Sequence, residues 1–128
     1  MPKKNSKDFA NAIGEYILEK KGKDVTLLDF NGKNDFAEFF IIATVESDPQ
    51  VQAIGDHIER SVKENYQITP HHREGVIKQS SWFILDYFDV IVHLFKPEER
   101  EKFSLEKLWI DAKLTRLSDD KVPSDDHY

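Results

Sequence analysis

Hydrophobic residues recur along this chain with two different spacings. Over residues 7–21 and 48–65 they return every three or four positions, which is the spacing of one face of an α-helix. The first stripe consists of Phe9, Ile13, Tyr16 and Ile17, and the second consists of Val51, Ile54, Ile58 and Val62. The pattern therefore predicts two amphipathic helices. Asn5 or Ser6 would cap the first helix, and Asp48, followed by Pro49, would cap the second.

Four other stretches are short and almost continuously apolar: residues 25–30, 36–45, 82–85 and 90–95. They are rich in aromatic and β-branched side chains, which favours strands over helix. The link between the last two stretches, Asp86 to Asp89, is too short for a helical crossover. We therefore expect residues 82–95 to form an antiparallel hairpin.

The order of these elements predicts the fold class. Residues 67–75 have the composition of a polar loop, and Pro97 opens a charged helix over residues 98–109, with residues 110–117 as a candidate extension. Helices alternating with pairs of strands are typical of an α/β fold with a single mixed β-sheet flanked by helices on both faces. Residues 1–117 form the one expected domain. Residues 118–128, with four aspartates and one lysine, are expected to be a disordered acidic tail.

Composition narrows the class of partner. The formal net charge is −6 and no basic run is longer than the pairs Lys3-Lys4 and Lys20-Lys21, so binding to DNA or RNA through phosphates is disfavoured. A basic protein partner fits better. The absence of cysteine excludes disulfides and cysteine-based zinc sites. Since no apolar run approaches the ~18 residues of a membrane span and the N-terminus has no signal-peptide core, we expect a cytoplasmic protein.

The hairpin and the segment after it carry a recognisable motif. The order W-x-x-L-D-x-x-D-V-x-V-H-x-F, then P-E-x-R-x-x-F-x-L-E-x-L-W, resembles the ribosomal silencing factor family, also called Iojap-like proteins. The residues that carry this resemblance are Trp82, Leu85, Asp86, Asp89, Val90, Val92, His93, Phe95, Pro97, Glu98, Arg100, Phe103, Leu105, Glu106, Leu108 and Trp109. The similarity extends over roughly residues 20–109 and includes S-D-x-Q-V-x-A-I at residues 47–54. One position departs from the pattern, because the family usually has glycine where this chain has Phe88.

The resemblance implies both a fold and a function. The fold would be an α/β domain related to nucleotidyltransferases but without their catalytic motif. Such proteins bind the large ribosomal subunit through its fourteenth large-subunit protein, on the face that meets the small subunit. They block subunit joining by steric exclusion and so lower protein synthesis. We therefore expect a translational repressor that is not an enzyme and that needs no cofactor or metal.

The residues expected to face or support the partner lie on the hairpin and on the helix after it: Trp82, Leu85, Tyr87, Asp89, His93 and Arg100. Trp82 and Tyr87 would be aromatic anchors, and Tyr87 and Phe88 are the aromatic residues expected to be exposed at the polar corner. Asp89 and Arg100 would match charges on the partner. His93 would support the surface, with Asp86 or Asp89 as its hydrogen-bond partner.

Two other functions remain open on the same residues. Asp86 and Asp89 could hold magnesium for a nucleotidyltransferase-like reaction, although the chain lacks the Gly-Ser pair of those enzymes. Aspartates at a hairpin corner more often accept hydrogen bonds from turn amides. His71 and His72 lack a third anchored metal ligand. The other alternative is a homodimer whose apolar patch is a self-interface, since family members can dimerise.

Overall fold

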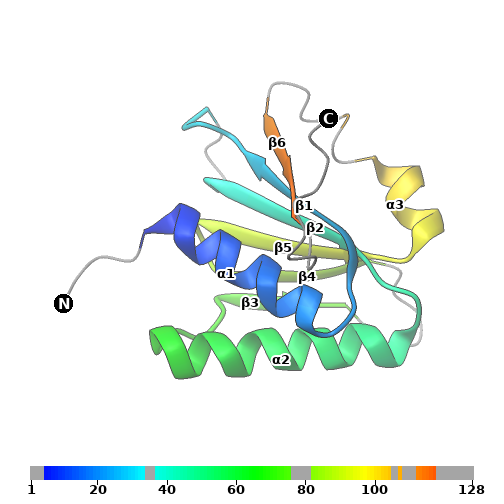
Figure 1. Ribbon diagram of the computed structural model, residues 1–128, viewed down its shortest axis with the longest axis horizontal. Helices are drawn as coiled ribbons and strands as arrows, with labels where there is room; N and C mark the ends of the chain where they lie inside the picture. Colours follow the sequence, from blue (N-terminus) through cyan, green and yellow to red (C-terminus); the bar gives the residue numbers. More distant parts are fainter. Residues whose placement is uncertain (1–4, 34–36, 76–81, 105–106, 108–111, 118–128) are drawn as a thin grey trace.

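The structure of the chain is a computed structural model, and it describes residues 5–33, 37–75, 82–104, 107 and 112–117. Within these residues lie three helices and six strands (Figure 1). In chain order they are α1 (Ser6–Glu19), β1 (Lys23–Asp29), β2 (Phe39–Thr44), α2 (Asp48–Tyr66), β3 (His72–Glu74), β4 (Trp82–Asp86), β5 (Val90–Phe95), α3 (Pro97–Phe103) and β6 (Lys113–Arg116). The strands form one sheet in the order β3-β4-β5-β2-β1-β6.

The sheet is mixed, as the sequence predicts. β2 and β5 pair in parallel, with Ile41 opposite Val92, and the other neighbouring pairs are antiparallel. The chain passes from β2 to β5 through α2, β3 and β4. β4 and β5 form the predicted antiparallel hairpin, in which Trp82 lies opposite Phe95. The mixed α/β sheet and the hairpin are therefore confirmed.

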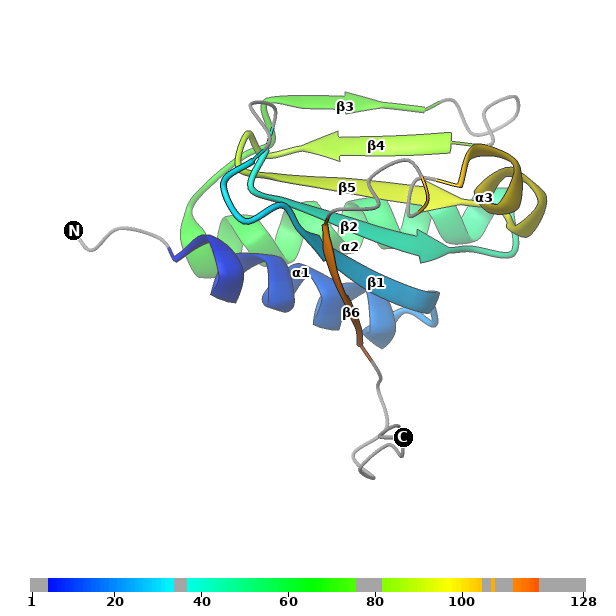
Figure 2. The same cartoon turned by 90° about the horizontal axis from the view of Figure 1, so that it is seen from above.

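The main core lies on one face of the sheet. α1 and α2 pack side by side against this face (Figures 1 and 2). Alternate strand residues are buried beneath these helices. Both predicted apolar stripes face this core, and Phe9, Ile13 and Ile17 of α1 are fully buried. The strands contribute Leu27, Ile41, Ala43, Leu85, Val90, Val92 and Leu94, among others.

The second face of the sheet is covered less evenly. A smaller buried cluster there includes Phe40, Ile42 and Phe95. α3 lies on this face and is joined to the sheet by Arg100, which donates to the hydroxyl oxygens of Thr44 and Thr26, both at 3.0 Å. Helices therefore lie on both faces, as predicted, but the two long ones share one face.

Two edge strands differ from the sequence prediction. β3 lies inside the predicted polar loop, where His72 pairs with Asp86 of β4. β6 occupies residues that were expected to extend the last helix, and its Thr115 pairs with Leu27 of β1. Both strands are short and bury no residue completely, so backbone pairing at the sheet edge defines them. No apolar pattern marks β3 or β6, and for this reason neither strand has a signal in the sequence.

α3 ends earlier than predicted. Ser104 follows it in a left-handed conformation with φ of 48°, and the Ser104 N–H donates to the Arg100 carbonyl at 2.9 Å. The predicted continuation to residue 109 is therefore interrupted after Phe103. The predicted disordered tail over residues 118–128 lies outside the described residues.

The helix starts follow the predicted chemistry with one difference. Asn5 caps α1, because its side-chain oxygen accepts from the Asp8 N–H at 3.0 Å. Ser47, and not the predicted Asp48, caps α2 by accepting from the Gln50 N–H at 3.3 Å. The neighbouring Asp48 carboxylate instead forms an ion pair with Lys96 at 2.6 Å, which links the start of α2 to the end of β5.

Candidate partner-binding site

The corner between β4 and β5 is a tight turn centred on Phe88. The Asp89 N–H donates to the Tyr87 carbonyl at 3.0 Å, which closes a γ-turn, and Phe88 at its centre has a φ of +75°. The Asp86 carboxylate accepts from the Phe88 N–H at 2.7 Å. A positive φ is strained for a residue with a side chain and unstrained for glycine, the residue that the resembled family usually has here.

The side chain of Phe88 projects from this corner. Its exposed fraction is 65%, and among the described residues only Leu114, at 51%, is another large hydrophobic side chain with such exposure. The ring of His71 lies against Phe88, with 4.1 Å between ring centroids and an interplanar angle of 33°. The backbone N–H of His71 also donates to the Asp86 carbonyl at 2.8 Å. The corner thus presents a supported pair of rings, and Phe88 is exposed as predicted.

Asp89 has a structural role at the corner. Its carboxylate accepts from the Ser6 hydroxyl at 2.6 Å, and its carbonyl accepts from the N–H groups of Glu38 and Phe39 at 2.8 and 3.0 Å. These bonds hold the start of α1 and the entry to β2 against the hairpin. Asp86 thus accepts from a turn amide, which is the ordinary role of an aspartate at such a turn, whereas the Asp89 carboxylate binds a hydroxyl group far away in the sequence.

The expectation that Tyr87 is exposed is wrong. Only 3% of Tyr87 is exposed, and its ring packs edge-on against Phe9 of α1 at 5.4 Å between centroids. Burial raises the pKa of the Tyr87 hydroxyl, and this hydroxyl has no hydrogen-bond partner within the described residues. Leu85 is fully buried in the same core. Neither residue contacts a partner directly in this conformation.

Trp82 and His93 form a connected pair on the second face. The Trp82 Nε1–H donates to His93 Nδ1 at 3.0 Å, so the expectation of an aspartate as the partner of His93 is wrong. His93 is 5% exposed, and burial lowers its pKa to about 3. The imidazole is therefore neutral near pH 7, and because Nδ1 accepts, Nε2 carries the proton. Trp82 is half-buried and remains reachable from solvent.

Arg100 contacts its own chain extensively. Its guanidinium donates to the Asp24 carbonyl at 2.6 Å and to the hydroxyls of Thr44 and Thr26. These bonds join α3 to the ends of β1 and β2, so Arg100 is a positioning residue for α3. It lies on a different part of the second face from the corner residues, and the structure does not bring it together with Asp89.

The magnesium hypothesis requires a cluster of metal-ligating side chains. Within the described residues, no three His, Cys, Asp or Glu side chains gather closely enough to hold a metal ion. The His72 ring and Glu74 carboxylate lie 3.6 Å apart as an exposed pair.

No described helix has the length and hydrophobicity to cross a bilayer.

The expected set of site residues omitted Phe88 and His71. The strand pattern contains a signal for Phe88, because alternation after Phe83 and Leu85 places Tyr87 on the core face. The residue after Tyr87 then points away from that face. His71 has no comparable signal, since only the pairing of β3 with β4 brings it to the corner.

The open mixed sheet with two helices on one face defines a small α/β domain. The sequence profile described as "Ribosomal silencing factor during starvation" matches residues 3–127, and the chain belongs to this family. The protein named Ribosomal silencing factor RsfS from Bacillus subtilis is 39% identical over 113 residues, which cover 88% of this chain and 94% of that protein. The resemblance predicted from the hairpin motif is therefore confirmed.

Two further comparisons agree with this assignment. Protein Iojap, chloroplastic, from Arabidopsis thaliana is 33% identical over 104 residues, which cover 81% of this chain and 42% of that protein. A crystal structure of a Chromobacterium violaceum protein superposes with a TM-score of 0.77 at 26% identity, covering 94% of this chain and 98% of that one. The fold is thus similar to one already observed in a crystal.

Proposed function

We propose that this chain represses translation by binding the large ribosomal subunit through its fourteenth large-subunit protein. The bound domain occupies the face that meets the small subunit and blocks joining. The observation that carries the proposal is membership of the silencing-factor family over residues 3–127. The mechanism is steric, so it uses no catalytic group and no cofactor, and it operates in the cytoplasm.

The docking surface in this proposal is the corner patch, which comprises Phe88, His71, Trp82, Ile84 and Ile91. Trp82 and Ile84 share the second face of β4 by alternation, and Ile91 lies opposite Asp86 on the same face. All three are half-buried, so each keeps some surface for contact. Burial of aromatic and aliphatic side chains at the centre of such a patch gives most of the affinity in protein interfaces.

The charge around the corner patch suits a basic partner. Asp86 and Glu74 lie on the same face, because Glu74 pairs with Ile84 and His72 pairs with Asp86. Carboxylates at the rim of an apolar patch favour a positively charged protein and speed its encounter. Phe88 takes the anchoring role first expected of Tyr87, while Asp89 secures the corner from behind through Ser6.

The corner is also preorganised for binding. Hydrogen bonds to Asp86 and across the γ-turn fix the backbone of Phe88, and the His71 ring supports its side chain. An anchor that is already ordered loses little conformational entropy when a partner covers it. Phe88 therefore makes the largest single contribution to binding.

The test compares two exposed hydrophobic residues. Phe88→Ala is expected to weaken co-sedimentation with purified large subunits about 30-fold, as for a central aromatic anchor worth about 2 kcal/mol. It is also expected to release the block on subunit joining in a light-scattering assay. Leu114→Ala removes an exposed side chain from β6, outside the corner patch, and is the matched control. A folded Phe88→Ala protein that binds as tightly as the control would refute the corner patch.

A further inference from the structure

His93 is a buried neighbour of the corner patch. On the second face of the sheet it lies directly opposite Ile84 of β4, and Ile91 lies two positions before it on β5. The centroid of the Trp82 ring is 5.8 Å from that of the imidazole. Trp82, Ile84 and Ile91 of the corner patch therefore all adjoin this one imidazole.

One nitrogen of the imidazole has a partner and the other has none. Nδ1 accepts from the Trp82 Nε1–H at 3.0 Å. Nε2, which carries the proton of the neutral ring, has no hydrogen-bond partner within the described residues. The two nitrogens lie on opposite sides of the ring, so the Nε2–H points away from Trp82. A buried donor without an acceptor costs free energy, and an acceptor supplied from outside the chain would remove this cost.

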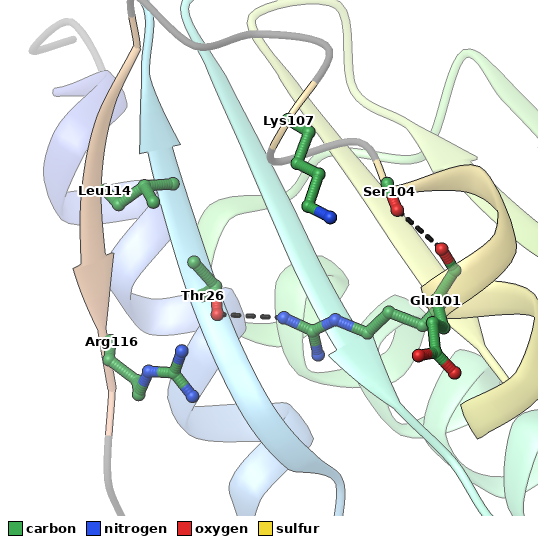
Figure 3. A pocket seen from close by; sticks show the side chains of 7 residues that line it. Thr26, Glu101, Ser104, Lys107, Leu114 and Arg116 are labelled. Atoms are coloured by element: carbon green, nitrogen blue, oxygen red, sulfur yellow. Dashed lines mark hydrogen bonds between the residues drawn. The ribbon is translucent and has the colours of Figure 1, made fainter.

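The pocket between α3 and β6 shows the more usual arrangement, in which polar side chains have partners in the chain. The Thr26 hydroxyl accepts from Arg100, and the Ser104 hydroxyl donates to the Glu101 carbonyl (Figure 3). These two hydroxyl groups are already bonded, whereas the His93 Nε2–H is not.

Two other buried side-chain atoms lack a hydrogen bond in the described part of the chain. One is the Tyr87 hydroxyl, which belongs to the main core on the first face of the sheet. The other is a carboxylate oxygen of Asp48, which forms the ion pair with Lys96. Among these atoms, His93 Nε2 is thus the donor that adjoins the corner patch.

We propose that the docking partner places a main-chain carbonyl oxygen against His93, where it accepts the Nε2–H. This contact rests on the proposed function, because it names the group that the partner brings to the corner patch. The imidazole is neutral near pH 7, and a neutral acceptor enters an apolar patch at a lower desolvation cost than a carboxylate does. A carbonyl on a fixed backbone also loses less conformational entropy than the end of a long polar side chain.

Trp82 fixes the proton on the nitrogen that faces the partner. Because the Trp82 Nε1–H occupies Nδ1, the imidazole cannot become an acceptor at Nε2 without losing that bond. The corner patch therefore favours a partner that presents an acceptor. It disfavours one that presents a donor or an apolar group, since the Nε2–H would then stay buried and unpaired. Trp82 is thus a positioning residue for His93 as well as a contact residue.

Access to His93 requires a small movement, because its exposed fraction is 5%. Ile84 and Ile91 adjoin it on the same face and are both half-buried. Changes of side-chain rotamer are common at interfaces whose backbones stay fixed. Movement of either isoleucine leaves the bond between Trp82 and His93 intact, so the proton stays on Nε2 during binding.

NMR of the full chain with nitrogen-labelled histidines observes the proposed bond directly. The signals of His93 are those that disappear in His93→Phe. In the free protein at pH 7 we expect a proton on Nε2 and none on Nδ1. Addition of the isolated fourteenth large-subunit protein should move the Hε2 resonance downfield and slow its exchange with solvent. An Hε2 resonance already at the hydrogen-bonded position in the free protein, or one that stays in place in the complex, would overturn the proposal.

Two variants measure what the donor contributes to affinity. Trp82→Phe keeps an aromatic ring and the His93 donor, and the double variant with Trp82→Phe and His93→Phe removes the donor as well. The double variant should bind large subunits about tenfold more weakly than Trp82→Phe, because it leaves the carbonyl of the partner unpaired. It should nevertheless resist urea at least as well, since an apolar ring replaces a buried polar ring without partners. Equal binding by the two variants would overturn the proposal.

His57→Phe is the matched control. His57 lies on α2, on the other face of the sheet, and its Nε2 is 2.7 Å from the Glu19 carboxylate. This substitution removes a bonded histidine away from the corner patch, so it should lower stability and leave binding to large subunits unchanged. A loss of binding equal to that caused by removing His93 would show general damage to the fold and would overturn the proposal.

Phe88→Ala separates this contact from the proposed function. If Phe88→Ala weakens docking but the Hε2 resonance of the parent does not move on binding, the corner patch stands and the His93 contact is refuted. If the resonance moves but Phe88→Ala binds as tightly as the parent, the His93 contact stands and the anchor role of Phe88 is refuted. A parent protein that binds neither large subunits nor the isolated protein would refute both.

Discussion

Phe88 permits a test in which the usual order of stability between alanine and glycine is reversed. Both substitutions remove the ring and its contact with His71, so that loss, about 0.5–1.5 kcal/mol, is common to the two variants. The two variants differ in how well the new residue tolerates the backbone conformation at position 88, where φ is +75°. Alanine keeps the Cβ that makes this conformation strained, by roughly 1–3 kcal/mol, whereas glycine does not.

The expected difference follows from two opposing terms. Relief of strain favours Phe88→Gly by about 2 kcal/mol, the middle of that range. Glycine loses about 0.5–1 kcal/mol more conformational entropy on folding than alanine does. The glycine variant should therefore be more stable than the alanine variant by about 1 kcal/mol, although glycine is the less stable of the two at most positions.

Urea unfolding of both variants measures this difference directly. Equal slopes with a higher midpoint for Phe88→Gly would support the argument, since the slope reports the surface exposed on unfolding. An alanine variant as stable as the glycine variant, or more stable, would refute the strained γ-turn. Both variants are expected to lose binding to large subunits equally, so the more stable protein would still be a weak binder.

Two further predictions concern the core. Burial lowers the pKa of His93 to about 3, so the unfolded chain takes up a proton below about pH 6.5 and the folded chain does not. Stability is therefore lost as the pH falls from about 6.5 toward 3, by roughly 2–3 kcal/mol at about pH 4.5. His93→Gln, which keeps an acceptor for Trp82, should lack this part of the pH dependence in urea unfolding, and identical profiles would contradict it. In Gly55→Ala, the new Cβ would lie 2.8 Å from Phe83 Cζ. The variant should lose about 1–3 kcal/mol in thermal or urea unfolding despite the helix preference of alanine, and a stabilised variant would be evidence against tight packing there.

The buried elements could be predicted because each has an apolar signature of its own. The stripe of α1 and the continuous run of β2 both face or lie within the core, and their residues are almost all buried. β3 and β6 have no such signature, because they are held by backbone pairing at the sheet edges. Local sequence does not show which exposed segment will find an open edge.

The candidate site was predicted in part. The motif located the hairpin, and the exposure of Phe88 was expected. The direction of each side chain, however, depends on where the strand ends and its side chains stop alternating between the two faces of the sheet. Tyr87 still follows the strand pattern and turns inward, and the γ-turn then turns Phe88 outward. The contacts of Arg100 with Thr26 and Thr44 join residues far apart in the chain, and no pattern in the sequence encodes them.

Although β6 is exposed, its position at the edge of the sheet affects how the protein meets other copies of itself. All four of its residues are exposed, yet its backbone covers the outer edge of β1, where residues 25–28 are buried. An uncovered edge beside an apolar strand recruits strands from neighbouring molecules. β6 is short and carries Lys113 and Arg116 at its ends, which makes it a poor template for such growth. A segment that adds nothing to the core thus shields the outer edge of β1 from pairing with another copy.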